Sequence, residues 1–149
     1  MPESVTVHSR RFGALEVAPE ELIDFPEGLV GLGGSRYVLV QTDVDSPFRW
    51  LQSAEDADLA LPVADPWAFF ADYALELSDA ATADAGLPED GTDVTVWVTV
   101  RAAAQRQDFS ANLRAPIVVH GGHGHQVLNE AADAPVRAPL FPEPQLQAA

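Results

Sequence analysis

The sequence predicts an all-β protein, mainly antiparallel, that folds as a small β-barrel-like or sandwich domain with one or two short helices. Short apolar or alternating runs recur along the chain, they are rich in Val, Tyr, Phe and Trp, and residues such as Pro, Gly, Asp and Asn separate them. Runs of this length and spacing are typical of antiparallel sandwiches and barrels, whose strands are half buried and joined by turns. The strands predicted in this way span residues 5–7, 14–17, 22–25, 37–42, 48–53, 59–65, 73–77, 94–100, 115–120 and 125–128.

The stretch "VTVWVTV", residues 94–100, is the clearest of these strands. Its valines occupy alternate positions and fall on one face, while Trp97 and two threonines fall on the other, which is the period-two pattern of a strand. The large indole of Trp97 indicates that the second face is covered as well.

Two stretches predict short helices. In "DPWAFFADY", residues 65–73, Asp is placed as an N-cap and Pro as the first helical residue, so we expect one helical turn that carries Trp67, Phe69 and Phe70 toward the sheet. In "SDAATADAG", residues 78–86, a serine N-cap leads into alanines and a glycine follows them, which predicts a helix of two turns.

The chain length of 149 residues fits one domain. We assign residues 1–130 to a single β-barrel-like domain and residues 131–149 to a Pro/Ala-rich C-terminal tail. Four prolines follow Leu128, and proline lacks the backbone N–H that regular strand pairing needs. The tail is therefore expected to be extended or disordered.

The charge of the chain excludes one class of function and suggests another. The 23 acidic residues face 8 basic ones, all of them arginine, which gives a formal net charge of −15. Because a nucleic-acid binder must neutralise phosphates with Lys and Arg, we expect no direct contact with nucleic acid. Residues 37–100 hold 13 Asp or Glu and only Arg49, a balance of −12. Such a surface either steers a basic partner or simply keeps the protein in solution.

The compartment is expected to be the cytoplasm, with no membrane contact. The N-terminal stretch "MPESVTVHSRRFG" lacks the pattern of a secretion signal, and no apolar run approaches the roughly 18 residues that span a bilayer. The chain has no cysteine, so disulfides, thiol catalysis and cysteine zinc sites are excluded.

The six-residue stretch "HGGHGH", residues 120–125, contains three histidines, His120, His123 and His125. Three converging imidazoles could hold zinc or copper, which leaves open a small metal-binding β-barrel enzyme that uses this loop. The other interpretation is a hairpin tip in which the glycines adopt positive φ and the histidines are solvated. We favour the hairpin and expect no metal and no cofactor, since no second shell of ligands is visible in the sequence.

Other catalytic patterns are missing from the sequence. There is no Gly-x-Ser-x-Gly stretch, and "GLVGLGG", residues 28–34, has the glycines of a phosphate-binding loop without its Lys-Ser/Thr ending, so it is interpreted as a loop between strands. The acidic "EDAD", residues 55–58, is typical of a solvated turn. A carbohydrate-binding sandwich with Trp50 or Trp67 as a stacking platform stays open.

Two short stretches are unusual enough to need an explanation. "PFRWLQS", residues 47–53, places Phe48 and Trp50 close to Arg49, and strand alternation is expected to turn one of these rings away from the other. An exposed aromatic ring beside an arginine would suit a protein contact, whereas burial of both rings is the alternative. "NLRAP", residues 112–116, places Asn112 at a turn from which Arg114 would project into solvent or toward a carboxylate.

Several stretches, read in order, resemble the FliW family of bacterial flagellar assembly factors. They are "IDFPEGLVGLGGSRYVLV", "PFRWLQSAEDADLALPVADPWAFFADYALEL", the Leu-Pro of "GLPED" followed by "VTVWVTV", and "ANLRAPIVVHGGHGHQVL". The likeness covers residues 22–128, and no single stretch is as specific as their order.

The resemblance implies a small β-barrel-like chaperone without enzymatic activity that takes part in bacterial flagellum biogenesis. It implies binding to CsrA (carbon storage regulator), a basic RNA-binding protein that represses flagellin translation, and binding to flagellin in a separate, exclusive complex. By antagonising CsrA, such a protein would relieve the repression. The partner-binding candidates are the matched residues that could lie at the surface: Arg49, Trp50, Gln52, Ser53, Asp65, Pro66, Asp72, Tyr73, Asn112 and Arg114.

Overall fold

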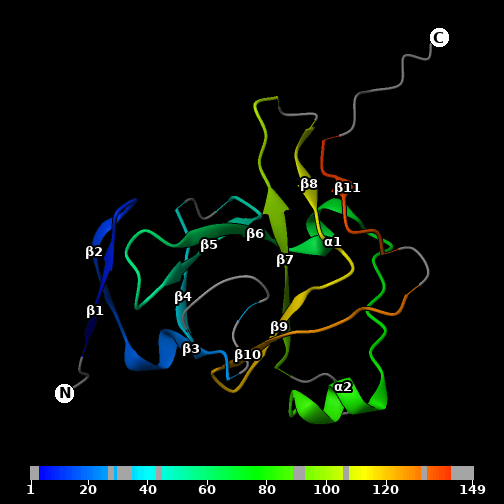
Figure 1. The fold of residues 1–149 in the computed structure, drawn as a ribbon, viewed down its shortest axis with the longest axis horizontal. Coiled ribbons are helices and arrows are strands. Elements are labelled where there is room, and N and C mark those ends of the chain that lie inside the picture. Colours follow the sequence, from blue (N-terminus) through cyan, green and yellow to red (C-terminus); the bar gives the residue numbers. More distant parts are fainter. Residues whose placement is uncertain are drawn as a thin grey trace.

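The fold is a closed β-barrel with a separate hairpin and two short helices, which confirms the all-β prediction (Figure 1). The computed structural model describes residues 4–26, 29, 35–42, 45–88, 93–105, 108–131 and 134–141. Its strands are β1 (Val5–Ser9), β2 (Gly13–Val17), β3 (Leu22–Asp24), β4 (Arg36–Val40), β5 (Phe48–Ser53), β6 (Ala60–Ala64), β7 (Thr95–Arg101), β8 (Ser110–Ala111), β9 (Ile117–His120), β10 (His123–Gln126) and β11 (Ala138–Pro139). The helices are the 3-10 turn η1 (Pro19–Glu21), α1 (Pro66–Phe69) and α2 (Asp79–Asp84).

Strand pairing closes the barrel. The larger sheet runs in the order β11-β8-β7-β6-β5-β4-β3-β10-β9, and an additional pairing of β7 with β9 joins its far end back to β7. The strands from β3 to β7 with β9 and β10 therefore form a ring. All its pairs are antiparallel except β10 with β3. Strands β8 and β11 extend the wall beyond the ring, beside the end of β7 (Figure 1).

The barrel interior is one apolar cluster, built from the inward-facing positions of the strands. Its buried members are Ile23, Phe25, Leu29, Tyr37, Leu51, Val63 and Ile117. Gly124 of β10 lets the wall approach this cluster closely, because a Cβ at that position would lie 2.5 Å from ring atoms of Phe25. Trp97 packs against the same cluster, so the second face of β7 is covered, as the sequence indicated.

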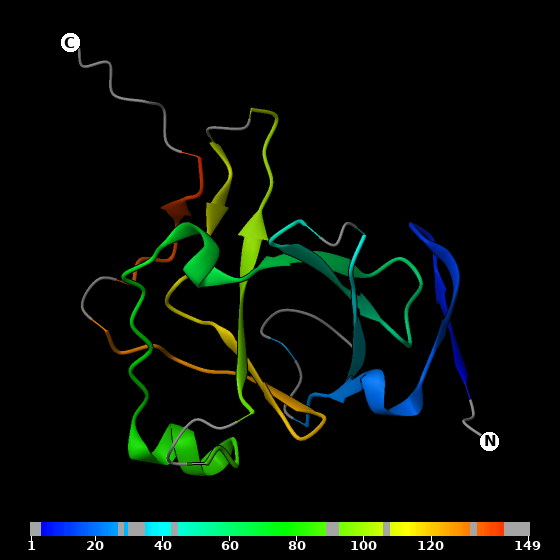
Figure 2. The ribbon, with the colours of Figure 1, turned by 180° about the vertical axis from the view of Figure 1, so that it is seen from behind.

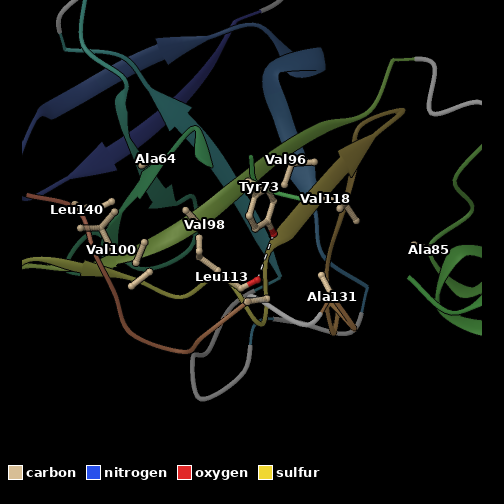
Figure 3. Packing of buried hydrophobic residues seen from close by; sticks show 13 residues of the cluster. Ala64, Tyr73, Ala85, Val96, Val98, Val100, Leu113, Val118, Ala131 and Leu140 are labelled. Atoms are coloured by element: carbon tan, nitrogen blue, oxygen red, sulfur yellow. Dashed lines mark hydrogen bonds between the residues drawn. The ribbon is translucent and has the colours of Figure 1, made fainter. Parts of the chain in front are cut away.

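A second apolar cluster lies outside the barrel and includes Val96, Val98 and Val100 of β7 (Figure 3). The segment that carries α1 and α2 covers it from one side, and Figure 2 shows this segment passing along the barrel. In Figure 3 the Tyr73 hydroxyl points at the Leu113 carbonyl oxygen, 3.3 Å away. The outer face of β7 is thus the floor of a second core.

The β1–β2 hairpin forms a two-stranded sheet of its own and packs through Val7 and Val17 against Val38 of β4. Its three-residue loop ends at Gly13, whose φ of +79° suits a glycine after a tight turn. The Ser9 hydroxyl accepts hydrogen bonds from two backbone N–H groups of this loop. The hairpin is therefore held to the barrel by a small third cluster.

Both helix predictions are confirmed. The Asp65 carboxylate accepts a hydrogen bond from the Trp67 backbone N–H at the start of α1, and the Ser78 hydroxyl accepts one from Ala81 at the start of α2. Phe69 packs against the outer cluster as expected. The expectation for Trp67 is wrong, because its side chain is 44% exposed and its indole N–H donates to the Tyr73 carbonyl oxygen instead.

The strand predicted at residues 73–77 does not form. The backbone of this segment does not pair with a strand. Instead, the Glu76 N–H donates to the Asn129 side chain, and the Glu76 carbonyl oxygen accepts from the Glu130 N–H. Alternation in "YALEL" indicates one buried face, and Tyr73 is indeed buried. Burial of alternate residues in an extended segment does not require ladder pairing.

The C-terminal segment packs against the barrel as far as the structure describes it. Ala134, Ala138 and Leu140 are buried in the outer cluster, and β11 pairs with β8. The packing therefore continues past residue 130, where the sequence suggested that the domain ends. Residues 132–133 and 142–149 of the expected tail, and all but Leu29 of the expected loop at 28–34, lie outside the described residues.

Candidate protein-binding surface

Arg49 of β5 lies at one end of the barrel wall on the inward-facing side. Its Nη1 donates hydrogen bonds to the carbonyl oxygens of Ser46, at 2.7 Å, and Phe48, at 3.0 Å. Its guanidinium carbon lies 5.6 Å from the ring centroid of Trp97, within the range of a cation–π contact. These contacts fix a half-buried arginine near the edge of the barrel.

Trp50 points to the outer side of the wall and contacts the β1–β2 hairpin. Its ring packs edge-on against Phe12, with centroids 6.1 Å apart, and the Arg11 guanidinium lies 4.1 Å from its centroid. Phe48, two residues away, shares this side of the strand and packs against Phe69. The expected separation of the two rings is therefore wrong, and both are half buried.

Gln52 and Ser53 are fully buried and hold the β5–β6 turn together. The Gln52 amide group donates to the carbonyl oxygens of Ser53, Asp56 and Leu59, and its oxygen accepts from the Ser9 hydroxyl. The Ser53 hydroxyl accepts hydrogen bonds from the backbone N–H groups of Glu55 and Asp56 in the turn. In this structure the two side chains build the fold and present no surface to a partner.

The four candidates around α1 differ in how far they are buried. Pro66 and Tyr73 are buried, Asp65 is the half-buried N-cap of α1, and Asp72 is exposed. Burial raises the pKa of the Tyr73 hydroxyl, while its hydrogen bond with Asn129 opposes that shift. Of these four residues, Asp72 is the one open to a partner.

Asn112 and Arg114 form a turn that closes on the C-terminal segment. The Asn112 side-chain oxygen accepts from the backbone N–H groups of Arg114 and Ala115, at 3.0 and 3.1 Å. The Arg114 Nε donates to the Ala134 carbonyl oxygen at 2.7 Å, so this guanidinium does not project freely from the turn as the sequence suggested. Both side chains are half buried.

Sheet register places Arg49 and Asn112 in one row across the barrel wall. Arg49 pairs with Val63, and Val63 pairs with Thr99. Asn112 donates its N–H to the Thr99 carbonyl oxygen, and the register of β11 with β8 continues the row to Arg137. Thr99 and Arg137 also belong to this row but were not among the candidates predicted from the sequence. The chain has only 8 basic residues, so each arginine, Arg137 included, is a candidate for a specific contact.

The three histidines lie on a tight β9–β10 hairpin, as the hairpin interpretation predicts. His120 pairs with His123 across Gly121 and Gly122, whose φ values are +60° and +78°. A ring nitrogen of His120 lies 3.3 Å from the Asp93 carbonyl oxygen. Within the described ranges no group of three or more His, Cys, Asp or Glu side chains is placed to hold a metal ion. The geometry therefore gives the metal-site alternative no support.

The acidic middle of the chain, residues 37–100, presents its charge to solvent. Of its ten described Asp and Glu residues, only Asp65 is half buried and the other nine are exposed: Asp45, Glu55, Asp56, Asp58, Asp72, Glu76, Asp79, Asp84 and Asp93. Four of these nine, Asp72, Glu76, Asp79 and Asp84, lie in the segment that carries α1 and α2. The surface thus offers a broad negative field with few compensating cations.

No helix within the described residues has the length and hydropathy of a membrane span.

Comparison with known proteins assigns the chain to a family. The sequence model of the FliW protein family matches residues 6–140. Similar curated proteins, each named flagellar assembly factor FliW, come from Desulfitobacterium hafniense strain Y51, at 38% identity over 92% of this chain and 91% of the relative, and from Leptospira biflexa, at 31% identity over 90% of both chains.

Comparison of the fold with solved structures points to the same family. The chain is similar to a crystal structure of the flagellar assembly factor FliW with a TM-score of 0.82 and 28% identity, over 94% of this chain and 99% of that one. The family match reaches residue 140 and so includes β11, which packs against the barrel. On the sequence model, the relatives and the fold together, this chain belongs to the FliW family of flagellar assembly factors.

Proposed function

We propose that this protein acts in flagellar assembly as a cytoplasmic, non-enzymatic regulator that binds CsrA and flagellin in mutually exclusive complexes. By binding CsrA it would relieve repression of flagellin synthesis. The observation that carries the first half of this proposal is the exposed acidic middle of the chain, whose field suits a basic RNA-binding protein.

The surface candidates support a protein contact more than a catalytic one. Trp50 and Arg49 are half buried beside other rings and cations, and aromatic and arginine side chains are the residue types that dominate protein interfaces. Asp72 adds an exposed charge from the acidic middle. The buried Gln52, Ser53, Pro66 and Tyr73 would support the shape of this surface without touching a partner.

Calorimetric titration of the untagged, full-length protein with CsrA from the same organism tests the proposal, with flagellin absent and then already bound. We expect tight binding that bound flagellin abolishes. Simultaneous binding of both proteins would overturn the exclusive complex, and no binding of CsrA would overturn the proposed regulation.

Two triple variants locate the CsrA contact. The first, Asp72→Asn with Asp79→Asn and Asp84→Asn, removes three exposed charges from the acidic middle; the second, Glu20→Gln with Glu21→Gln and Asp108→Asn, removes three exposed charges elsewhere. If the acidic middle contacts CsrA, the first variant weakens binding more than the second, because close charges act more strongly than screened distant ones. Equal weakening would assign the attraction to net charge alone.

A further inference from the structure

Beyond the barrel ring, the strands β7, β8 and β11 lie side by side as a small ribbon (Figure 1). Arg101 of β7 pairs with Ser110 of β8, and Ser110 pairs with Pro139 of β11. The next row on the same face holds Thr99, Asn112 and Arg137. It is the far end of the row that begins at Arg49. Two arginines thus lie in neighbouring rows of one face.

The opposite face of this ribbon belongs to the outer core. Val100, Ala111 and Ala138 occupy the alternate positions of the three strands and are buried. Because successive side chains on a strand point to opposite faces, the arginine-bearing face is the one turned to solvent. Arg101 and Arg137 are both exposed.

This face is hollowed between the two arginines. A hollow of about 240 Å³ is lined by Thr99, Arg101, Ser110, Asn112, Val136 and Arg137. A second hollow of about 420 Å³ adjoins it and shares Arg101, Ser110 and Arg137 with it. Asp108 lines the second hollow, whereas the described residues that line the first include no carboxylate.

The smaller hollow offers hydrogen-bond donors. Both salt bridges that the structure shows within its described ranges lie elsewhere, between Arg10 and Asp58 and between Arg36 and Asp24, so neither arginine of the hollow takes part in them. The Asn112 side-chain oxygen is used inside its own turn. Within the described residues no hydrogen bond is seen from its amide N–H₂ group, from the hydroxyls of Thr99 and Ser110 or from the two guanidinium groups, so these groups can serve a ligand.

We propose that this hollow binds the carboxylates of an acidic peptide segment on a partner protein. A guanidinium group donates two parallel N–H bonds that match the two oxygens of a carboxylate. In a chain with net charge −15, a pair of arginines that forms no salt bridge within the described residues is a local exception that attracts an acidic segment, although Asp108 in the adjoining hollow offsets part of its charge. This site is distinct from the acidic middle and does not rest on the binding of CsrA or flagellin.

Fluorescence anisotropy with a fluorescein-labelled hexaglutamate peptide tests the proposal on the untagged, full-length protein at low ionic strength. We expect saturable binding, and we expect the double variant Arg101→Gln with Arg137→Gln to weaken it by about tenfold or more, because charge-assisted hydrogen bonds are lost. Both side chains are exposed, so thermal unfolding of the variant should match that of the unchanged protein.

The matched control is the double variant Arg10→Gln with Arg36→Gln, which removes two exposed arginines on other surfaces and changes the net charge equally. It should keep most of the affinity. An equal loss in both variants would show that only net charge matters and would overturn the site, and so would the absence of hexaglutamate binding to the unchanged protein.

Two further measurements, competition binding and chemical-shift mapping, identify the chemical class of the ligand and the position of its site. Inorganic phosphate and a hexaglutamine peptide are used as competitors: weak competition by both supports a carboxylate-bearing peptide, whereas phosphate that competes as well as unlabelled hexaglutamate overturns the peptide assignment. Amide chemical shifts should change on hexaglutamate addition at Thr99, Ser110 and Asn112. Changes confined to other strands would overturn the placement.

Discussion

Two buried amide side chains, Gln52 and Asn129, connect segments that are far apart in the sequence. Gln52 links the β5–β6 turn to Ser9 in the β1–β2 hairpin. Asn129 donates to the Tyr73 hydroxyl and to the Ala74 carbonyl oxygen. Since a buried polar group must be paired to be tolerated, each amide fixes the relative position of its partners.

Replacing Asn129 by alanine should lower the free energy of unfolding by about 3 kcal/mol, because backbone groups buried around it lose their partner. Among these groups is the Glu76 N–H, which donates to Asn129 at 2.9 Å. Urea unfolding followed by circular dichroism measures the change. The half-buried Asn112, which holds two local bonds, is the matched control: Asn112→Ala should cost about 1 kcal/mol. Equal costs would contradict the argument.

Glu55 should make the stability of the protein depend on pH. Backbone N–H groups of Ser35, at 2.6 Å, and Arg36, at 3.2 Å, donate to its carboxylate and hold its pKa below the ordinary value of 4.5. Because the pKa of Glu55 is lowered in the folded state, its ionised carboxylate stabilises the fold. This stabilisation is complete above the ordinary pKa and disappears as pH falls through the folded-state pKa. Glu55→Gln should therefore lower Tm at pH 7, and the difference should shrink below pH 4.5.

Thermal unfolding at stepped pH values measures the effect of Glu55→Gln. The control is Glu20→Gln, since Glu20 is exposed on η1 and no hydrogen bond to its carboxylate is seen within the described residues. Its Tm should follow that of the unchanged protein throughout. A Tm difference for Glu55→Gln that stays constant from pH 7 to acid would count against the assigned hydrogen bonds.

At the scale of elements, β10 depends on a glycine to close the barrel. Gly124 faces Phe25, which also packs edge-on against Tyr37 with centroids 5.4 Å apart. The parallel contact of β10 with β3 rests on a short register, the pair His123 with Asp24. Small changes at this seam should therefore affect the closure of the ring.

Gly124→Ala should lower the free energy of unfolding by about 1–3 kcal/mol, because the added methyl group overpacks the barrel interior. The neighbouring atoms are the outer ring carbons of Phe25 and a methyl group of Ile23, at 2.5 and 3.0 Å. Phe25→Leu removes the crowded ring, so the double variant should be more stable than the sum of the two single changes predicts. Additive costs in denaturant unfolding would refute the contact.

At the scale of the whole molecule, charge and apolar surface are arranged in separate regions. One apolar cluster fills the barrel and two lie outside it. The acidic middle covers the α1–α2 side and the β5–β6 turn, while the arginines of the β7–β8–β11 ribbon lie past the open end of the ring. A partner would therefore meet different charges on different sides of the barrel.

If the acidic middle steers CsrA, the association rate should fall steeply with ionic strength, while the dissociation rate should change little. Stopped-flow tryptophan fluorescence at salt concentrations from about 0.05 to 0.5 M, where the Debye length shortens severalfold, measures both rates. An association rate that does not change with salt would contradict steering. The Asp72, Asp79 and Asp84 triple variant should show a shallower salt dependence than the unchanged protein.

The sequence by itself determined the all-β class, most strand positions and both helix starts, because these depend on local patterns. Alternation marks a strand such as β7, and an Asp-Pro or Ser cap marks a helix start within a few residues. The Gly121–Gly122 turn was visible for the same reason, since positive φ is a local requirement. The family resemblance rested on such stretches in order.

Only the tertiary structure decided which of the matched polar residues face solvent. Alternation says that Gln52 and Trp50 share a side of β5 but not what covers that side, and the β1–β2 hairpin covers it there. The row from Arg49 to Arg137 depends on the register of five strands that are distant in sequence. Pairing between distant strands is set by the packing of the whole barrel, and for that reason no short stretch contains it.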